Sequence, residues 1–167
     1  MASTLFKRAR TAKPSRRYPS RRLRVEPLEQ RTLLSVFSVT NLGNSGGGSL
    51  RGAIQAANAN VGPDTIEFAV AGTVNLTYDL PALSDLTGGT KIDGTTAPGY
   101  SGVPVVVLRG AGPTSFGGLQ ITSPNNEVRA LQIGALNYGI LILGETASGN
   151  VIAGNYIGTD GSVATPN

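Results

Sequence analysis

Two segments in the C-terminal part of the chain repeat the same order of apolar and polar positions. Residues 126–134 (NEVRALQIG) and 150–158 (NVIAGNYIG) align without a gap at a spacing of 24 residues (150 − 126), and a short apolar run bounded by glycine, residues 137–144 (NYGILILG), lies between them. Self-similarity at a fixed period of this size is typical of proteins whose successive windings stack. Each winding holds short apolar runs and no helical segment, so the pattern predicts an all-β fold, a parallel β-helix or short solenoid.

The repeat also predicts which side chains face the interior, since alternate residues of a strand point the same way and neighbouring strands lie roughly 4.8 Å apart. We expect ten apolar residues to stack in the core: Val106, Leu108, Leu119, Ile121, Val128, Ile133, Ile140, Ile142, Ile152 and Ile157. Asn126 and Asn150 are expected to form a ladder at a turn, each side-chain amide bonding to the next winding. Ligand binding is the alternative role for these two residues.

The region before the repeats, residues 36–78, has a different pattern. Alternating apolar residues predict strands at 36–40, 64–70 and 73–77. Residues 91–93 are predicted to form the end of a further strand, and residues 103–108 another strand. Leu50, Ile54 and Ala57 recur at helical spacing behind Ser49, a residue type that caps a first turn. We therefore expect one short helix over 49–58, which covers the open end of the first winding, while residues 79–167 form the windings themselves.

The glycines at 46–48 precede this helix and raise the question of a phosphate site, because exposed amides at a helix start attract anions. The segment lacks the Lys-Ser/Thr ending of a P-loop and the spacing of a dinucleotide fingerprint. A flexible turn into the helix is the preferred interpretation.

Composition excludes several kinds of chemistry. The 167 residues contain no cysteine and no histidine, so disulfides, thiolate nucleophiles, Ser/His/Asp triads and the usual zinc sites are absent. Twenty-three glycines, 5% aromatic residues and 14% charged residues fit a turn-rich β protein. No run of apolar residues is long enough to cross a bilayer.

Charge divides the chain into a basic tail and a mildly acidic body. Ten of the 14 Lys and Arg residues lie within 1–31, interleaved with proline and serine. Such a sequence cannot bury enough surface to order itself, so residues 1–35 are expected to form a disordered basic tail. Targeting or sorting is its favoured role. Nucleic-acid binding is the lesser alternative, because a basic face and stacking aromatic residues are missing from the body.

Residues 25–35 (VEPLEQRTLLS) resemble the LEPR-type motif that planctomycete bacteria place at the start of large surface and extracellular proteins. The match departs from the usual form, because Val25 replaces the first Leu and the Arg comes only at Arg31. This resemblance implies export or cell-surface sorting.

Residues 49–68 (Ser-Leu-Arg, Ala-Ile, then Asp-Thr-Ile-Glu-Phe) resemble the CSLREA-type opening of bacterial β-helix proteins, with Gly48 in place of Cys and Gly52 in place of Glu. Together with residues 91–100 and 150–161, this segment resembles the sequences of proteins in the pectin-lyase-like group. That resemblance implies a right-handed parallel β-helix. For a polysaccharide lyase of the group it further implies acidic residues that bind calcium and an Arg or Lys as base.

The body contains eleven candidate residues for such chemistry: Asp64, Glu67, Asp79, Asp85, Asp93, Glu127, Glu145, Asp160, Lys91, Arg109 and Arg129. No two of them recur at the period of the windings in a way that would stack them on one face. Asp93 and Asp160 stand beside glycines, where turns favour Asp, and Arg129 should face outward. We therefore assign no catalytic, cofactor-binding or metal-binding residue.

The sequence thus predicts an exported or cell-surface β-helix module with a structural, adhesive or carbohydrate-binding role. Its expected partners are polysaccharide or cell-envelope components and further windings of a longer chain, since only about three windings are present. Nucleic acid is not expected as a partner. The alternative is the N-terminal part of a polysaccharide lyase or glycoside hydrolase, and only this alternative implies calcium.

Overall fold

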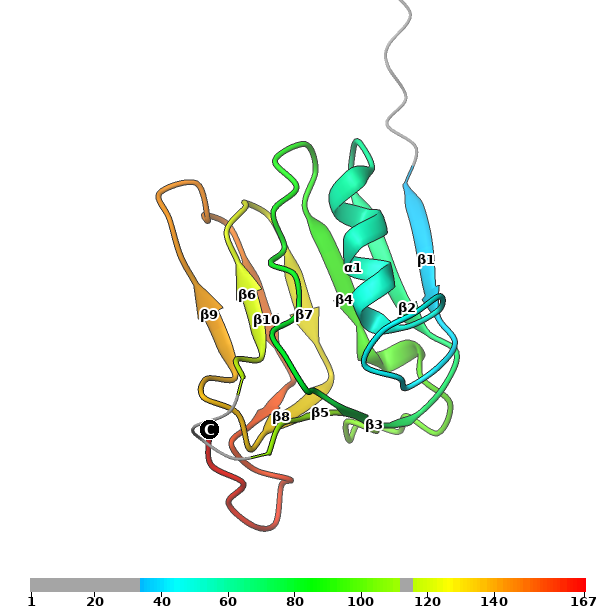
Figure 1. Ribbon diagram of the computed structural model, residues 1–167, viewed down its shortest axis with the longest axis vertical. Helices are drawn as coiled ribbons and strands as arrows, with labels where there is room; N and C mark the ends of the chain where they lie inside the picture. The colour runs from blue at the N-terminus through cyan, green and yellow to red at the C-terminus, as the bar shows by residue number, and fades with distance from the viewer. Residues whose placement is uncertain (1–33, 112–115) are drawn as a thin grey trace, which may run out of the picture. The chain divides into compact units, whose positions relative to one another are not determined.

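The computed structural model describes residues 34–111 and 116–167, and the predictions for residues 1–33 lie outside them. The elements follow in the order β1 (Ser35–Val39), α1 (Leu50–Ala59), β2 (Asp64–Phe68), β3 (Gly72–Asn75), β4 (Thr90–Asp93), the 3₁₀ helix η1 (Gly94–Thr96), β5 (Val106–Arg109), β6 (Leu119–Ile121), β7 (Glu127–Arg129), β8 (Leu131–Gly134), β9 (Ile140–Ile142), β10 (Val151–Ala153) and β11 (Tyr156–Ile157). The described chain is therefore mostly β, with one α-helix (Figure 1).

The strands form three sheets, and all of their pairings are parallel. The order is β1-β2-β4-β7-β10 in the five-stranded sheet, β11-β8-β5-β3 in the four-stranded sheet and β6-β9 in the two-stranded sheet. From β4 onward, strands that follow one another lie in different sheets: the chain passes from the five-stranded sheet to the four-stranded and the two-stranded sheet and then returns to the first. The predicted parallel arrangement of the repeats is confirmed.

The register places equivalent apolar residues beside one another on neighbouring strands. In the five-stranded sheet, Ile66 pairs with Ile92, Ile92 with Val128, and Val128 with Ile152. In the four-stranded sheet the same relationship joins Val74, Leu108, Ile133 and Ile157. Partners in register point to the same side of a sheet, so these columns build the core.

Six of the ten predicted core residues are fully buried, but three are exposed. Ile142, Ile152 and Ile157 expose 45%, 37% and 42% of their surface, and Ile140 is half-buried. The exposed residues lie on β9, β10 and β11, and no described strand pairs with the far side of these three strands. The prediction assumed that every winding is covered on both sides, whereas these three residues lie in the last described winding, which is covered on one side.

The strand predicted over 103–108 begins later than expected. β5 starts at Val106, while Val103 is 50% exposed in the preceding turn. The apolar character of residues 103–105 therefore does not mark a buried strand.

The predicted helix is confirmed and lies against the edge strand β1 and against β2 (Figure 1). Ser49 caps it, because its Oγ accepts a hydrogen bond from the Gly52 N–H at 3.2 Å. Leu50, Ile54 and Ala57 are completely buried in the core. The apolar residues whose spacing predicted the helix are thus also the ones that pack it against the sheet.

Candidate functional site

The predicted asparagine ladder is present directly before β7 and β10. The Asn150 Oδ1 accepts hydrogen bonds from the Asn126 backbone N–H at 2.7 Å and from its Nδ2 at 3.0 Å. Asn126 in turn accepts from the Thr90 N–H at 2.8 Å and donates to the Ser123 carbonyl at 2.9 Å. These contacts satisfy backbone groups of three consecutive windings, which is a structural role.

A third asparagine acts in the same way at the corner between β10 and β11. Asn155 Oδ1 accepts from the Leu131 N–H at 2.9 Å, and its Nδ2 donates to the Val128 carbonyl at 2.8 Å. The sequence comparison missed it because Asn155 faces a leucine in the repeat, so no matching side chain marked the position.

Arg51 is a further residue whose role the sequence did not reveal. It is only 8% exposed, and its guanidinium donates to the carbonyls of Asn44, Tyr78 and Asp79 at 2.8, 3.0 and 2.6 Å. Its Cζ also lies 3.9 Å from the centre of the Tyr78 ring, within the range of a cation–π contact. Arg51 therefore fastens two loops to α1.

The loop before α1 closes through its own backbone. Gly48 accepts from the N–H groups of Thr40 and Asn41, and Gly46 accepts from the Ser49 Oγ at 2.7 Å. The Gly46 and Gly48 carbonyls thus accept hydrogen bonds from residues of the same loop, as expected for a turn.

Five charged side chains lie together on the outer face of the five-stranded sheet, which corrects the sequence analysis. Glu67 pairs in register with Asp93, Asp93 with Arg129, and Lys91 with Glu127. The expectation that no two charges share a face was wrong, because it assumed one fixed period. The windings differ in length: Thr90 and Asn126 are 36 residues apart, whereas Asn126 and Asn150 are 24 apart.

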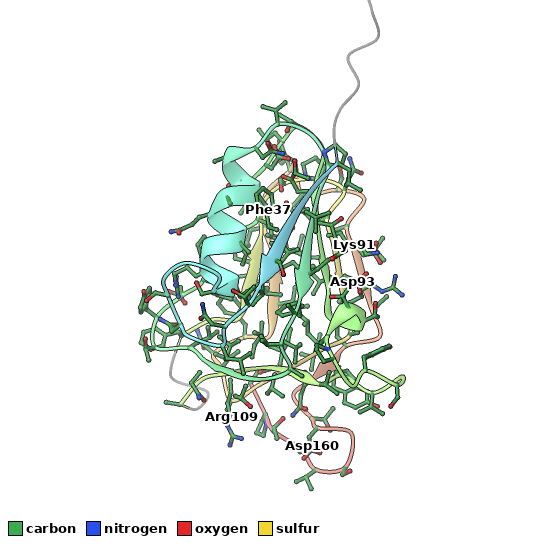
Figure 2. All side chains as sticks on the ribbon, turned by 90° about the vertical axis from the view of Figure 1, so that its right-hand side faces the viewer. Phe37, Lys91, Asp93, Arg109 and Asp160 are labelled. Atoms are coloured by element: carbon green, nitrogen blue, oxygen red, sulfur yellow. The ribbon has the colours of Figure 1, made fainter. Side chains whose placement is uncertain are left out.

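Asp93 is the centre of this charged cluster. Its carboxylate lies 2.9 Å from Lys91 Nζ and 3.8 Å from Arg129 Nε, and it accepts from the Thr95 N–H at 3.0 Å as the cap of η1. Burial raises the pKa of Asp93, but the hydrogen bonds from Thr95 and the contact with Lys91 outweigh it, so the pKa lies below its ordinary value. Figure 2 shows Lys91 and Asp93 side by side.

Arg129 faces outward as predicted, and it is held by two carboxylates. Its Nη1 lies 3.3 Å from Glu127 Oε1, in addition to the contact with Asp93. A guanidinium already paired on both sides has less capacity to bind a ligand. The cluster is therefore an internally compensated group of charges.

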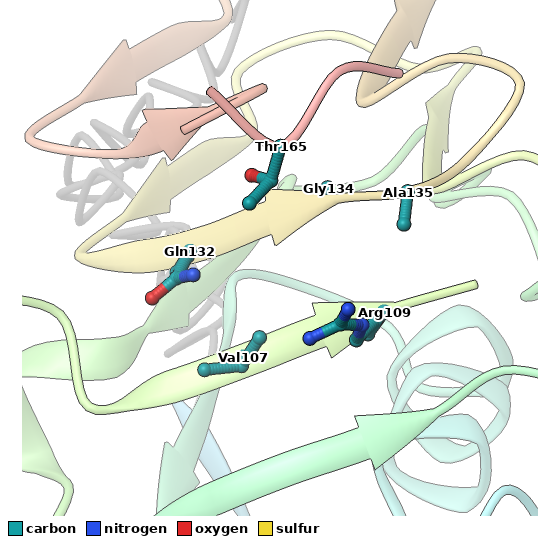
Figure 3. Close-up of a pocket in the computed structure, with 6 residues that line it drawn as sticks. All are labelled: Val107, Arg109, Gln132, Gly134, Ala135 and Thr165. Atoms are coloured by element: carbon teal, nitrogen blue, oxygen red, sulfur yellow. The ribbon is translucent and has the colours of Figure 1, made fainter. Parts of the chain in front are cut away.

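Arg109 lies apart from this cluster, on the outer face of the four-stranded sheet (Figure 2). It is exposed and forms no ion pair with any residue in 34–111 or 116–167. A small pocket, partly open to solvent, adjoins it (Figure 3). The pocket is lined by Val107, Arg109, Gln132, Gly134, Ala135 and Thr165.

The strand register explains why these residues line one pocket. Val107 pairs with Gln132 and Arg109 with Gly134, so the polar side chains of β5 and β8 share the outer face. A Cβ on Gly134 would lie 2.6 Å from the Thr165 Oγ1, so glycine is needed for residue 165 to approach β8. The Thr165 Oγ1 is buried and has no hydrogen-bond partner among the described residues.

Three of the remaining candidates, Asp79, Glu145 and Asp160, are dispersed. Asp160 is exposed in a turn, where hydrogen bonds from the Val163 and Ser162 N–H groups lower its pKa. Asp79 accepts from the Gly117 N–H at 2.7 Å, while burial and the Asp79 charge raise the pKa of Tyr138. Glu145 is exposed, and the structure does not bring these acids together.

Two features are absent from the part of the chain that the structure describes. No group of three or more acidic side chains is arranged to hold a metal ion. No helix there has the length and apolar character needed to cross a membrane.

Comparisons of the chain with models of protein families, with curated proteins and with solved structures find no match.

Proposed function

We propose that the chain is a parallel β-helix module of the cell surface that binds acidic carbohydrate through the Arg109 pocket. The observation that carries this function is the Arg109 guanidinium, which has no ion-pair partner among the described residues and shares a pocket with the Gln132 amide and Thr165. A guanidinium recognises a carboxylate through two parallel hydrogen bonds, and amide and hydroxyl groups bind sugar hydroxyls.

The solenoid architecture is part of the proposal. The passage of the chain through three parallel sheets and the in-register columns support a β-helix, and the resemblance of residues 49–68 to β-helix openings supports its right-handed form. The LEPR-like residues 25–35 support export or a cell-surface location. Further windings would pair with the unpaired edges of β9, β10 and β11, where apolar side chains are exposed.

The pocket is shallow and partly open to solvent, so the proposed contact is with the carboxylate of one sugar residue and does not enclose the sugar ring. A polymer that presents many such residues would gain affinity by multivalency when several modules lie on one surface. Many weak contacts of this kind acting together would suit an adhesive or scaffolding role.

Calorimetric titration with an oligogalacturonide tests the function, with a neutral glucan oligomer as the ligand control. We expect Arg109→Gln to weaken binding of the acidic oligomer at least tenfold, because it removes the charge that pairs with the carboxylate. Arg129→Gln is the matched protein control, since Arg129 is already paired and lies on another sheet. Equal affinity of the wild type and Arg109→Gln would disprove the assignment.

A polysaccharide lyase or hydrolase is the second candidate, and the charged cluster around Asp93 favours it. Carboxylates and cations on one sheet face are the groups that such chemistry uses. An assay on acidic polysaccharides with added calcium tests it. Turnover that Arg129→Ala abolishes and Arg109→Gln retains would place an active site at the cluster.

A further inference from the structure

A buried polar group lies where β2 and β4 begin, separate from the charged cluster and from the Arg109 pocket. Asp64 pairs in register with Thr90, and their side chains are 2% and 0% exposed. Both lie on the face that carries Ile66 and Ile92 into the core, since they precede these residues by two positions. Asp85, which is 5% exposed, is linked to the same segment, because the Thr87 hydroxyl that donates to it accepts from the N–H of Gly62, two residues before Asp64.

Hydrogen bonds fix both carboxylates through one oxygen each. Asp64 Oδ1 accepts from Asn60 Nδ2 at 2.7 Å, and Asp85 Oδ1 accepts from the Thr87 N–H at 2.8 Å. The Thr87 Oγ1 donates to Asp85 Oδ1 at 2.6 Å and accepts from the Gly62 N–H at 2.8 Å. The loop that carries Asp85 is therefore tied to the segment that leads into β2.

Three oxygens at this place have no hydrogen-bond partner among the described residues. They are Asp64 Oδ2, Asp85 Oδ2 and Thr90 Oγ1, and each atom is buried. An unsatisfied buried polar group is destabilising, and a charged one more so. Three such atoms in one neighbourhood therefore indicate a ligand that accepts electron pairs from oxygen.

The charges point to a cation. Neither Asp64 nor Asp85 forms an ion pair with a Lys or Arg in the described part of the chain. Buried carboxylates require a positive partner or a proton. A single proton would neutralise only one of the two carboxylates.

We propose that Asp64 Oδ2, Asp85 Oδ2 and Thr90 Oγ1 contribute ligands to one buried calcium ion. The donors are all oxygens, which hard cations prefer over softer metals. Two carboxylates balance the charge of a divalent ion. The ion joins β2, β4 and the Asp85 loop, so its role is to hold two neighbouring windings together.

Calorimetric titration of the full chain with calcium chloride, after removal of metals with a chelator, tests the site. We expect saturable binding with one ion per chain and a Kd of about 10⁻⁴–10⁻³ M, as in other extracellular modules. The thermal midpoint should rise with calcium concentration, since the ion binds the folded state. Absence of saturable binding to the wild-type chain would overturn the proposal.

Matched variants locate the ion. Asp64→Asn and Asp85→Asn should each weaken calcium binding at least tenfold, whereas Asp160→Asn, in an exposed turn, should leave the affinity unchanged. Thr90→Val keeps the side-chain shape and should weaken binding several-fold, while Thr90→Ser retains the hydroxyl and should bind like the wild type. If the Asp variants do not fold, the Thr90 pair decides, and equal affinity of Thr90→Val and the wild type would contradict the site.

Discussion

Asn126 and Asn150 stand directly before paired parallel strands, and one oxygen of Asn150 accepts both the backbone and the side-chain N–H of Asn126. Asn126 repeats this relationship toward Thr90 on the other side. The ladder therefore holds three windings in register at a position where the strands have not yet begun to pair.

Removal of the Asn126 side chain should destabilise the protein strongly. Asn126→Ala leaves the buried Thr90 N–H without an acceptor, and we expect a loss of about 2–3 kcal/mol in the free energy of unfolding. Urea denaturation measures this loss. Asn137→Ala is the control, because Asn137 is exposed, and its expected effect stays within about 0.5 kcal/mol. Equal effects of the two variants would refute the structural role of the ladder.

Arg51 should matter for stability through its geometry as well as its charge. Arg51→Lys keeps the positive charge but cannot reach three carbonyls with one planar group. We expect both Arg51→Lys and Arg51→Ala to lower the free energy of unfolding, by about 1–2 and about 3 kcal/mol respectively. Arg109→Ala serves as the control in the same denaturation series, because Arg109 is exposed and has no ion pair within the described residues. A Lys variant as stable as the wild type would show that charge alone suffices.

Acid should weaken the protein through Asp93. The pKa of Asp93 in the folded state lies below the value of 3.8 for the free group. The unfolded chain therefore binds the proton first, so the stabilising contribution is present above pH 3.8 and is lost as the pH falls through the folded pKa. Asp93→Asn should be less stable than the wild type at pH 7, and the gap should narrow below pH 3.8. Thermal denaturation across pH 2–7 measures this, and a gap of constant size would contradict it.

Two isoleucines in the same column should respond differently to truncation. Ile92 is completely buried, so Ile92→Ala should cost about 2–5 kcal/mol of stability. Ile152 is 37% exposed on the edge strand β10, so Ile152→Ala should cost less than half as much. Urea denaturation of the two variants compares them directly. Equal losses would mean that a further layer covers Ile152.

The sequence predicted those parts of the fold that depend on local repetition. The 24-residue spacing identified Val128 over Ile152 and Asn126 over Asn150, and both pairs lie in register. Helical spacing identified Leu50, Ile54 and Ala57 because an amphipathic helix needs only its own residues to be recognised.

The charged cluster and the Arg109 pocket could not be predicted from a repeat of fixed length. The windings before Asn126 have other lengths, so the sequence did not show that Asp93 lies beside Arg129 or that Arg109 lies beside Gly134. Arg51 was also missed, because its partners are backbone carbonyls of loops, which any residue type supplies. The neighbours of these residues come from segments that are distant in the sequence, so only the folded structure reveals them.

The unequal lengths of the windings leave the columns undisturbed because the additional residues are placed outside the sheets. Residues 94–105 separate β4 from β5, whereas Ala130 alone separates β7 from β8, yet both pairs of strands keep their register with their neighbours. Segments of new sequence can therefore be inserted at the first corner during evolution or engineering. Such a chain can acquire binding loops without redesigning its interior.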